Sequence, residues 1–329
     1  MSYFNPNNLL KLIVRLFTIK PMPMKKLLIA FICCTFISAS FAQVPEGKKV
    51  ISSLYIYDLA TGKSNLILRE MRHFEAPNWS RDGKYLLINS TGRLEKISTM
   101  GDKLGELNTG LVQDANNDHG FSFDGKTLFI SSGKPEIKEH SSFIFKVAAE
   151  GGNPVQITPV STSYWHGVSP DGKDIVYCAN RNGNYDVYKM SVNGGAEIRL
   201  TTTEGLDDGP EYSPDGKFIY INSYRTGMMQ IWRMHADGSS PEQMTFDAHS
   251  NWFAHVAPNN KVATIITYLE DQKQAHPFGR QIKLRLLDLT TKKITDLTEA
   301  FYGGQGTINV PSWSPDGKQF AYVRYELMD

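Results

Sequence analysis

The sequence predicts an all-β protein built from repeated four-stranded meanders. Between Asp207 and Thr245, short runs of strand-forming residues alternate with turn signals, of which Pro214-Asp215-Gly216 is the clearest. A meander of this size cannot bury both of its faces, so copies of it have to stack against one another. The four runs are Glu211 to Ser213, Phe218 to Ser223, Gln230 to Met234 and Glu242 to Thr245.

The same turn recurs along the chain at regular intervals. Turn positions 82, 124, 171, 215, 259 and 316 are 42, 47, 44, 44 and 57 residues apart, close to the period of propeller blades. The degenerate copy at position 259 carries asparagine at both turn positions, which fits because asparagine also tolerates positive φ. The copies are Trp79-Ser80-Arg81-Asp82-Gly83, Phe121-Ser122-Phe123-Asp124-Gly125, Val168-Ser169-Pro170-Asp171-Gly172, Tyr212-Ser213-Pro214-Asp215-Gly216, Val256-Ala257-Pro258-Asn259-Asn260 and Trp313-Ser314-Pro315-Asp316-Gly317.

The two ends of the chain supply complementary halves of one blade. Leu54 to Leu59 and Ser64 to Arg69 match the third and fourth strands of the repeat, whereas Trp313 to Tyr325 supplies only a first and a second strand. Pairing the two ends leaves no open sheet edge in the ring. We therefore predict a six-bladed β-propeller over residues 43–329, with four-stranded antiparallel blades and a last blade closed by N-terminal plus C-terminal strands. The 57-residue spacing is assigned to an insert, Glu270 to Arg280, which is either a plain loop or one that shapes a ligand mouth.

Residues 1–42 are predicted to be an N-terminal extension and a secretory signal peptide. Lys25-Lys26, the apolar run Leu27 to Ile37 and the small-residue pattern Ser40-Phe41-Ala42 are the three parts of such a signal, and Met24 is an alternative start. The apolar run is too short for a membrane span. These features predict export to the periplasm. The alternative is a membrane-anchored protein that keeps an uncleaved N-terminal segment.

Composition narrows the range of partners. The net charge of +1 over 329 residues argues against a nucleic-acid partner. Removal of the signal leaves Cys178 as the one cysteine, and its place in an apolar run predicts a buried strand residue. We expect a monomer without a transmembrane span in the mature chain.

The segments that precede each turn are the candidate functional residues, because the innermost strand of a propeller blade begins at the mouth of the central channel. Polar and aromatic side chains gather in these segments, and Trp165 and Trp252 could offer a stacking surface there. The predicted channel-mouth residues are Glu75, Asn117, Asp118, His119, Trp165, His166, Asp207, Asp208, Asn251, Trp252 and His255.

Three of these residues, His119, His166 and His255, could hold a divalent metal, since imidazole and carboxylate are the usual ligands of zinc and manganese. His119 and His166 hold the same repeat position and should point alike if side chains alternate along the strand. The alternative is that the histidines hydrogen-bond neighbouring blades or line a wet channel. If the histidines have these structural roles, no cofactor is predicted. If they hold a metal, Mn, Zn or Ca binds at the mouth.

The repeats, with Ser-Pro-Asp-Gly-Lys after an aromatic residue, resemble the WD40-like PD40 repeats of the TolB propeller. The resemblance covers Val50 to Asp329 and does not include the α/β domain that TolB-like proteins carry ahead of the propeller. It implies a non-catalytic binding or scaffolding module that takes an envelope or secreted protein, a peptide or a small ligand. The alternative is a metal-dependent enzyme similar to oligogalacturonate lyases, which act on uronate-containing sugars through a histidine-bound metal.

Overall fold

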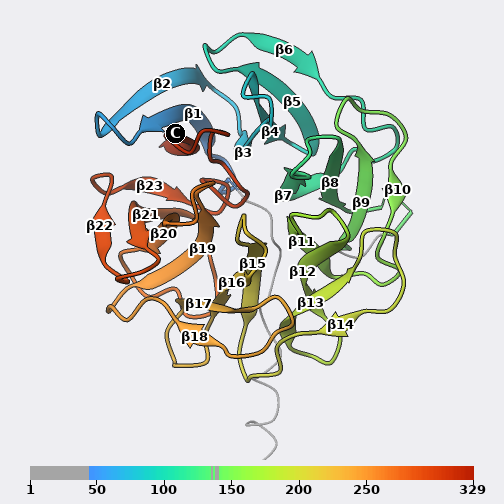
Figure 1. The fold of residues 1–329 in the computed structure, drawn as a ribbon. Helices are drawn as coiled ribbons and strands as arrows, with labels where there is room; N and C mark the ends of the chain where they lie inside the picture. Colours follow the sequence, from blue (N-terminus) through green and yellow to red (C-terminus); the bar gives the residue numbers. More distant parts are fainter. Residues whose placement is uncertain (1–43, 135, 138–140) are drawn as a thin grey trace, which may run out of the picture. The chain divides into compact units, whose positions relative to one another are not determined.

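The computed structural model describes residues 44–134, 136–137 and 141–329, and within these residues the chain forms strands and turns but no helix. Six sheets are arranged as blades around a central channel, and the first strand of each blade is innermost (Figure 1). The prediction of an all-β six-bladed propeller is therefore confirmed. In the same part of the chain no helix is long and apolar enough to span a membrane. The predicted signal segment lies outside the described residues.

Blades 1 to 4 are four-stranded antiparallel meanders, numbered here in chain order. Blade 1 contains β3 (Glu75–Trp79), β4 (Tyr85–Ser90), β5 (Arg93–Ser98) and β6 (Lys103–Glu106). Blade 2 contains β7 (Ala115–Phe121), β8 (Thr127–Ser132), β9 (Phe143–Ala148) and β10 (Val155–Gln156). Blade 3 contains β11 (Ser163–Val168), β12 (Asp174–Asn180), β13 (Tyr185–Ser191) and β14 (Ile198–Arg199). Blade 4 contains β15 (Asp207–Tyr212), β16 (Phe218–Ser223), β17 (Gln230–His235) and β18 (Glu242–Gln243).

Blade 5 is larger than predicted. It contains β19 (Ser250–Val256), β20 (Val262–Tyr268), β21 (Phe278–Asp288) and β22 (Ile294–Asp296), and a further short strand, β23 (Phe301–Gly304), pairs with the start of β21. The assignment of the whole insert to Glu270 to Arg280 is therefore wrong in two respects. Its last residues belong to β21, and part of the additional length lies in β23.

Blade 6 joins the two ends of the chain, as predicted. β1 (Lys49–Asp58) pairs with β24 (Gln319–Met328) along its whole length and with β2 (Lys63–Glu70) on its other edge. The inner segment 307–313 is irregular. Backbone bonds from Val323 N to Thr307 O (3.0 Å) and from Ala321 N to Ser312 O (2.9 Å) hold it against β24. Long antiparallel pairing of β1 with β24 thus closes the ring without leaving a free edge there.

The turn between the first two strands is fixed by its own side chains. In blade 4, the Ser213 hydroxyl donates to Asp215 Oδ1 (2.7 Å), and the same carboxylate oxygen accepts from Lys217 N (3.1 Å). Gly216 has a φ of +71°, a conformation that favours glycine. In blade 5, Asn260 takes this place with a φ of +58°, as its sequence predicts. The turn chemistry explains why the repeat is recognisable in the sequence.

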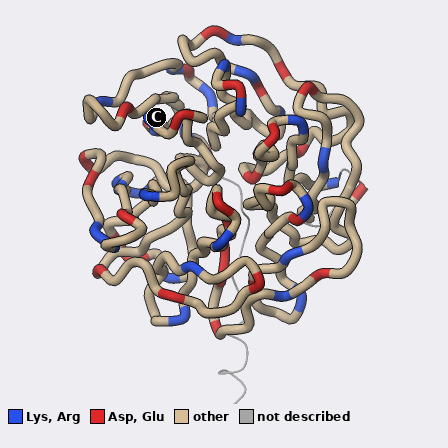
Figure 2. The backbone as a smooth tube through the Cα atoms, in the orientation of Figure 1, with Lys and Arg blue, Asp and Glu red and all other residues tan. Residues whose placement is uncertain are grey.

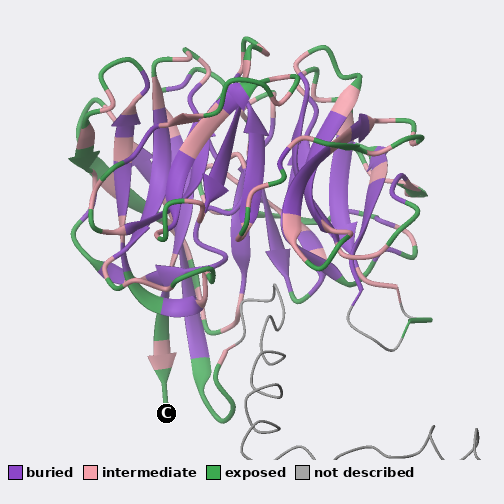
Figure 3. Cartoon of the chain, turned by 90° about the horizontal axis from the view of Figure 1, so that it is seen from below, coloured by how far each residue is buried: buried purple, intermediate pink, exposed green. Residues whose placement is uncertain are grey.

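The second strand of each blade is sandwiched between its neighbours and buried on both faces. Leu86, Leu87 and Ile88 of β4, for example, are all buried completely. Figure 3 shows the same pattern around the ring, with exposure confined to outer edges and loops. Between blades 2 and 3, Phe129 and Trp165 stack with ring centroids 5.7 Å apart. Such apolar contacts between sheets hold the blades together.

A buried side chain of each second strand in blades 1 to 4 also binds the inner strand of the next blade. These residues stand seven positions after the turn aspartate. The cysteine among them, Cys178, is only 2 % exposed, so the prediction of a buried strand residue is confirmed. The contacts are Asn89 Nδ2 to Ala115 O (2.9 Å), Trp165 N to Ser131 Oγ (2.7 Å), Cys178 Sγ to Asp207 O (3.5 Å) and Phe253 N to Asn222 Oδ1 (2.7 Å).

The inner strands are bulged near the channel. Three equivalent residues, Ala76, Gly209 and Phe253, have φ values of +53°, +59° and +50° and interrupt the pairing of β3, β15 and β19 with their neighbours. A bulge changes the direction of the side chains that follow it. The simple alternation of side chains along a strand therefore does not apply to the segments that line the channel.

Candidate binding sites at the two ends of the channel

All inner strands run in the same direction, so the channel has two chemically different ends. We call the end where these strands begin the channel mouth, and the end where the Ser-x-Asp-Gly turns lie the turn end. Acidic positions occur on the strands that border the channel (Figure 2). The mouth carries most of the ionisable groups, whereas the turn end is formed mainly by aromatic and proline side chains.

A carboxylate at the mouth is shared by two imidazoles from different parts of the chain. Asp208 of β15 lies 3.3 Å from His166 Nε2 through Oδ1 and 3.5 Å from His276 Nε2 through Oδ2. His166 comes from β11 of the preceding blade, and His276 comes from the loop between β20 and β21. The stacking of Phe253 on His166 and its edge contact with His276 fix the two rings beside the carboxylate.

Burial and charge act in opposite directions on this group. Burial disfavours ionised Asp208, but the hydrogen bond from His166 and the charges of both histidines hold the pKa of Asp208 well below its usual range. Burial likewise opposes charge on His166, yet Asp118 and Asp208 outweigh it and raise the pKa of His166. Burial lowers the pKa of His276, which Asp208 offsets only in part. Of the two imidazoles, His166 is therefore the one whose charged form Asp208 favours more.

Two further carboxyl groups at the mouth lose their protons less readily than usual. Burial, together with the charge of Asp208, raises the pKa of Asp118 to about 7, although His166 acts in the opposite direction. Burial and the proximity of Asp118 raise the pKa of Glu75 to about 8. A neutral carboxyl group can donate as well as accept a hydrogen bond. The mouth thus combines the His166–Asp208 contact with two carboxyl groups whose pKa values are raised.

Glu75 lies in a tight corner between blades 1 and 6. Ala76 N donates to Gly306 O (2.7 Å), which holds the segment after β23 against β3. Gly306 has a φ of +88°, and a Cβ there would lie 2.4 Å from Tyr325 Oη and 2.5 Å from Glu75 Oε2. Only glycine therefore fits at this position. His73 Nε2 is 4.0 Å from Glu75 Oε2 and completes the corner.

Several buried polar atoms around the mouth have no hydrogen-bond partner within the described residues. Both side-chain polar atoms of Asn117 are among them, although that residue is 1 % exposed. Unpaired buried polar atoms are costly, and in native proteins they usually bind water or a ligand. Those at the mouth are Glu75 Oε2, Asn117 Oδ1 and Nδ2, His276 Nδ1, Gln305 Nε2 and Asn309 Nδ2.

Four predicted mouth residues have other partners or positions. Asp207 binds Arg225 Nη2 (3.2 Å) and accepts from Thr203 Oγ1 (2.7 Å), because adjacent residues of β15 point in different directions. Asn251 accepts from Arg285 Nη2 (2.6 Å) inside blade 5. Trp165 and Trp252 are almost completely buried, and Trp165 lines the cavity at the turn end rather than the mouth. A stacking surface at the mouth stays a prediction that this geometry does not support.

The three candidate metal ligands have three different sets of contacts. His119 Nε2 lies 3.4 Å from Leu87 O of the preceding blade, whereas His255 Nδ1 lies 2.5 Å from Glu211 Oε2. His166, as described above, faces Asp208. Among the residues that the structure describes, no group of three or more histidine, cysteine, aspartate or glutamate side chains is arranged to hold a metal. A divalent metal at the mouth stays a prediction, and this geometry lends it no support.

The local backbone explains why His119 and His166 do not point alike. His166 is the extra residue of the bulge in β11, between the paired residues Trp165 and Gly167. His119 is itself paired, opposite Ile130 of β8, and its bulge precedes it. Equal positions in the repeat therefore have different backbone geometry.

Sequence reasoning missed three groups at the mouth. His276 lies in the loop between β20 and β21, and Gln305 and Asn309 follow β23. His276 and Gln305 lie outside the repeat, so position within the repeat could not identify them. Asn309 stands seven residues before Asp316, the repeat position of Glu75 and Asp208, and the repeat could have identified it. For His276, the one available signal was the insert Glu270 to Arg280. The interpretation of this insert as a loop that shapes a ligand mouth agrees with the position of His276.

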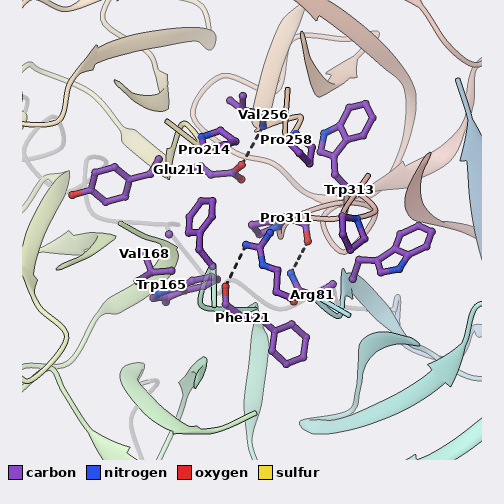
Figure 4. Close-up of a pocket in the computed structure, with 16 residues that line it drawn as sticks. Arg81, Phe121, Trp165, Val168, Glu211, Pro214, Val256, Pro258, Pro311 and Trp313 are labelled. Atoms are coloured by element: carbon purple, nitrogen blue, oxygen red, sulfur yellow. Dashed lines mark hydrogen bonds between the residues drawn. The ribbon is translucent and has the colours of Figure 1, made fainter. Parts of the chain in front are cut away.

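A cavity of about 330 Å³ occupies the turn end of the channel (Figure 4). Its walls come from all six blades and include the residues that the repeat places just before each turn, such as Trp79, Phe121, Tyr212 and Trp313. These aromatic side chains are largely buried. Arg81 and Glu211 are the charged residues of the lining.

The repeats, the closed ring and the bulged inner strands define a TolB-type β-propeller. The family model for the TolB β-propeller domain matches residues 166–326. An uncharacterised protein of Agrobacterium fabrum (strain C58) is 45% identical over 280 residues, which is 85% of this chain and 94% of that protein. The chain therefore belongs to the TolB β-propeller family.

Two solved structures show how far the similarity extends. A provisionally assigned TolB from Agrobacterium tumefaciens has a TM-score of 0.79 and 44% identity, covering 84% of this chain and 99% of that one. TolB from Acinetobacter baumannii has a TM-score of 0.56 and 16% identity, covering 78% of this chain and 64% of that one. The second similarity shows the propeller fold alone.

Proposed function

We propose that this protein is an exported propeller that acts as a non-catalytic binding module, and that it takes its ligand at the channel mouth. The ligand is a segment of an envelope or secreted protein, a peptide or a small molecule with several hydrogen-bonding groups. The observation that carries the proposal is the set of unpaired buried polar atoms at the mouth, which includes Glu75 Oε2 and both polar atoms of Asn117.

The chemistry of these atoms favours binding over reaction. Amide groups and neutral carboxyl groups both donate and accept hydrogen bonds, which suits a polar ligand held by many weak contacts. The pair His166–Asp208 is satisfied internally at 3.3 Å. The chain belongs to the TolB β-propeller family, and a binding function agrees with this membership. No contact in the described residues specifically favours the alternative, a metal-dependent lyase for uronate-containing sugars.

Export is part of the proposal and rests on the N-terminal sequence. The basic, apolar and small-residue parts of a secretory signal follow one another between Lys25 and Ala42. Fractionation of cells that express the full chain tests this. We expect the protein in the periplasmic fraction with residues 1–42 removed. Retention in the membrane fraction with the N-terminus intact would favour the anchored alternative.

The mouth is tested with the substitution Asn117→Leu, which replaces two unpaired polar atoms by methyl groups of similar volume. Because Asn117 loses no internal hydrogen bond, we expect the variant to fold and to unfold at the same or a higher temperature. Capture of partners from envelope extract by the immobilised protein, quantified by mass spectrometry, should fall at least tenfold.

The matched control is Asn153→Leu, in an exposed turn of blade 2 away from the channel. This variant should capture the same partners as the unaltered protein. Equal capture by the Asn117 and Asn153 variants would show that the mouth is not the binding surface. The absence of any specifically captured partner or small molecule would contradict the binding function itself.

A further inference from the structure

The turn end of the channel is distinguished by a break in the repeat. Four copies carry proline before the turn aspartate or asparagine, and three of these prolines, Pro214, Pro258 and Pro315, line the cavity. Blades 1 and 2 carry Arg81 and Phe123 there instead. Arg81 is therefore a charged residue at a repeat position that is apolar in the other blades.

Arg81 extends into the cavity and is held there by weak contacts. Its guanidinium carbon lies 4.7 Å from the centre of the Phe123 ring. Its Nη2 donates to Phe121 O at 3.5 Å (Figure 4) and its Nε donates to Ser122 O at 3.3 Å. Both distances are long for hydrogen bonds. No carboxylate lies within 4.0 Å of Arg81 in the described part of the chain. Most of its five donors are therefore available.

The acid that shares the cavity already has partners of its own. Glu211 accepts from His255 Nδ1 at 2.5 Å through Oε2 and from Val256 N at 3.1 Å through Oε1. The other ring nitrogen of His255 makes a short contact with Ile308 O. Both carboxylate oxygens of Glu211 are thus occupied by partners in blade 5, whereas Arg81 has no comparable partner and is the charged group of the lining that is left for a ligand.

We propose that this cavity is a second binding site, separate from the mouth, for a small carboxylate with an apolar body. The Arg81 fork fits a carboxylate, which accepts two parallel N–H bonds. The walls, formed by rings such as Trp79, Trp165 and Trp313, fit the apolar body. A volume of about 330 Å³ lies at the lower end of the range for small-molecule sites, so the ligand is smaller than a typical drug molecule.

The wall also provides the readout, because three of the five tryptophans of the chain line this cavity. The probes are phenylacetate, its neutral methyl ester and the cation phenethylamine, which share a phenyl ring and differ in charge. We expect phenylacetate to change the tryptophan fluorescence saturably, with an affinity at least tenfold higher than that of either analogue. Titration calorimetry checks that the fluorescence change reports binding.

The variant Arg81→Pro restores the residue that the repeat carries elsewhere, and Arg81→Gln keeps a polar side chain without the charge. Both should weaken phenylacetate binding at least tenfold while the melting temperature shows that they fold. Arg93→Gln, an exposed arginine paired with Glu106 on blade 1, is the control and should leave binding unchanged. The proposal is overturned if phenylacetate does not bind, if its ester binds equally well, or if the Arg81 variants retain the affinity.

Discussion

The burial of Glu75 predicts that the free energy of unfolding depends on pH through this one carboxyl group. The pKa of Glu75 is raised by burial, and further by Asp118, to about 8. A group whose pKa is higher in the folded protein binds its proton more tightly there. Its stabilising contribution is therefore fully present below the pKa of the unfolded chain, near 4.5, and is lost as the pH rises through 8. Glu75→Gln keeps a neutral side chain of the same size and should remove this dependence.

The size of the effect follows from the two pKa values. Each pH unit between them changes the free energy of unfolding by about 1.4 kcal/mol. Between pH 5 and pH 9, the unaltered protein should therefore lose about 4 kcal/mol that the variant keeps. Glu75 is only 4 % exposed, so solvent screening does not reduce this figure much.

Urea unfolding of both proteins at pH 5, 7 and 9 measures the difference directly. We expect the two free energies of unfolding to be similar at pH 5 and the variant to be the more stable protein at pH 9. Other titrating groups are common to both proteins and cancel in the comparison. Glu326→Gln, at an exposed pair with Arg69, serves as the control and should show a difference that changes little with pH. A constant difference for Glu75→Gln as well would refute the reasoning.

Two further substitutions test the contacts that position the site. Gly306→Ala places a Cβ 2.4 Å from Tyr325 Oη at a φ of +88° and should lower the free energy of unfolding by about 3 kcal/mol or more. Its control, Gly183→Ala, has a φ of +81° and nothing within 4 Å, and should cost only about 1 kcal/mol. Equal losses in thermal unfolding would contradict the close packing at Gly306. Asn222→Ala leaves the buried Phe253 N without its 2.7 Å partner and should cost about 1–3 kcal/mol, and a cost below 0.5 kcal/mol in urea unfolding would show that this contact between blades is unimportant.

The repeat made the architecture predictable because the turn that defines it is a local structure. Asp215 and Gly216 need only their near neighbours to form the hairpin, so their spacing reports the number of blades. Closure by the two ends followed from counting strands. The extra strand β23 could not be predicted, because Phe301–Gly304 is stabilised by pairing with β21 rather than by a strong pattern of its own.

The candidate site was only partly predictable for a related reason. Glu75, Asp118, His166 and Asp208 were found because they precede a recognisable turn. Their neighbour Asp207, equally polar in the sequence, binds Arg225 inside its own blade. Strand bulges decide which of two adjacent residues reaches the channel, and their position depends on the contacts with the next blade.

By itself, the sequence determined the six blades, the turn chemistry and the closure of the ring, since each depends on contacts between residues close in the chain or on counting. Only the tertiary structure decided the chemistry of the channel. His276 reaches Asp208, and Glu211 pairs with His255, across blade boundaries. Arg81 projects into a cavity walled by all six blades. Such contacts join residues far apart in sequence, and burial among them sets the charge of each group.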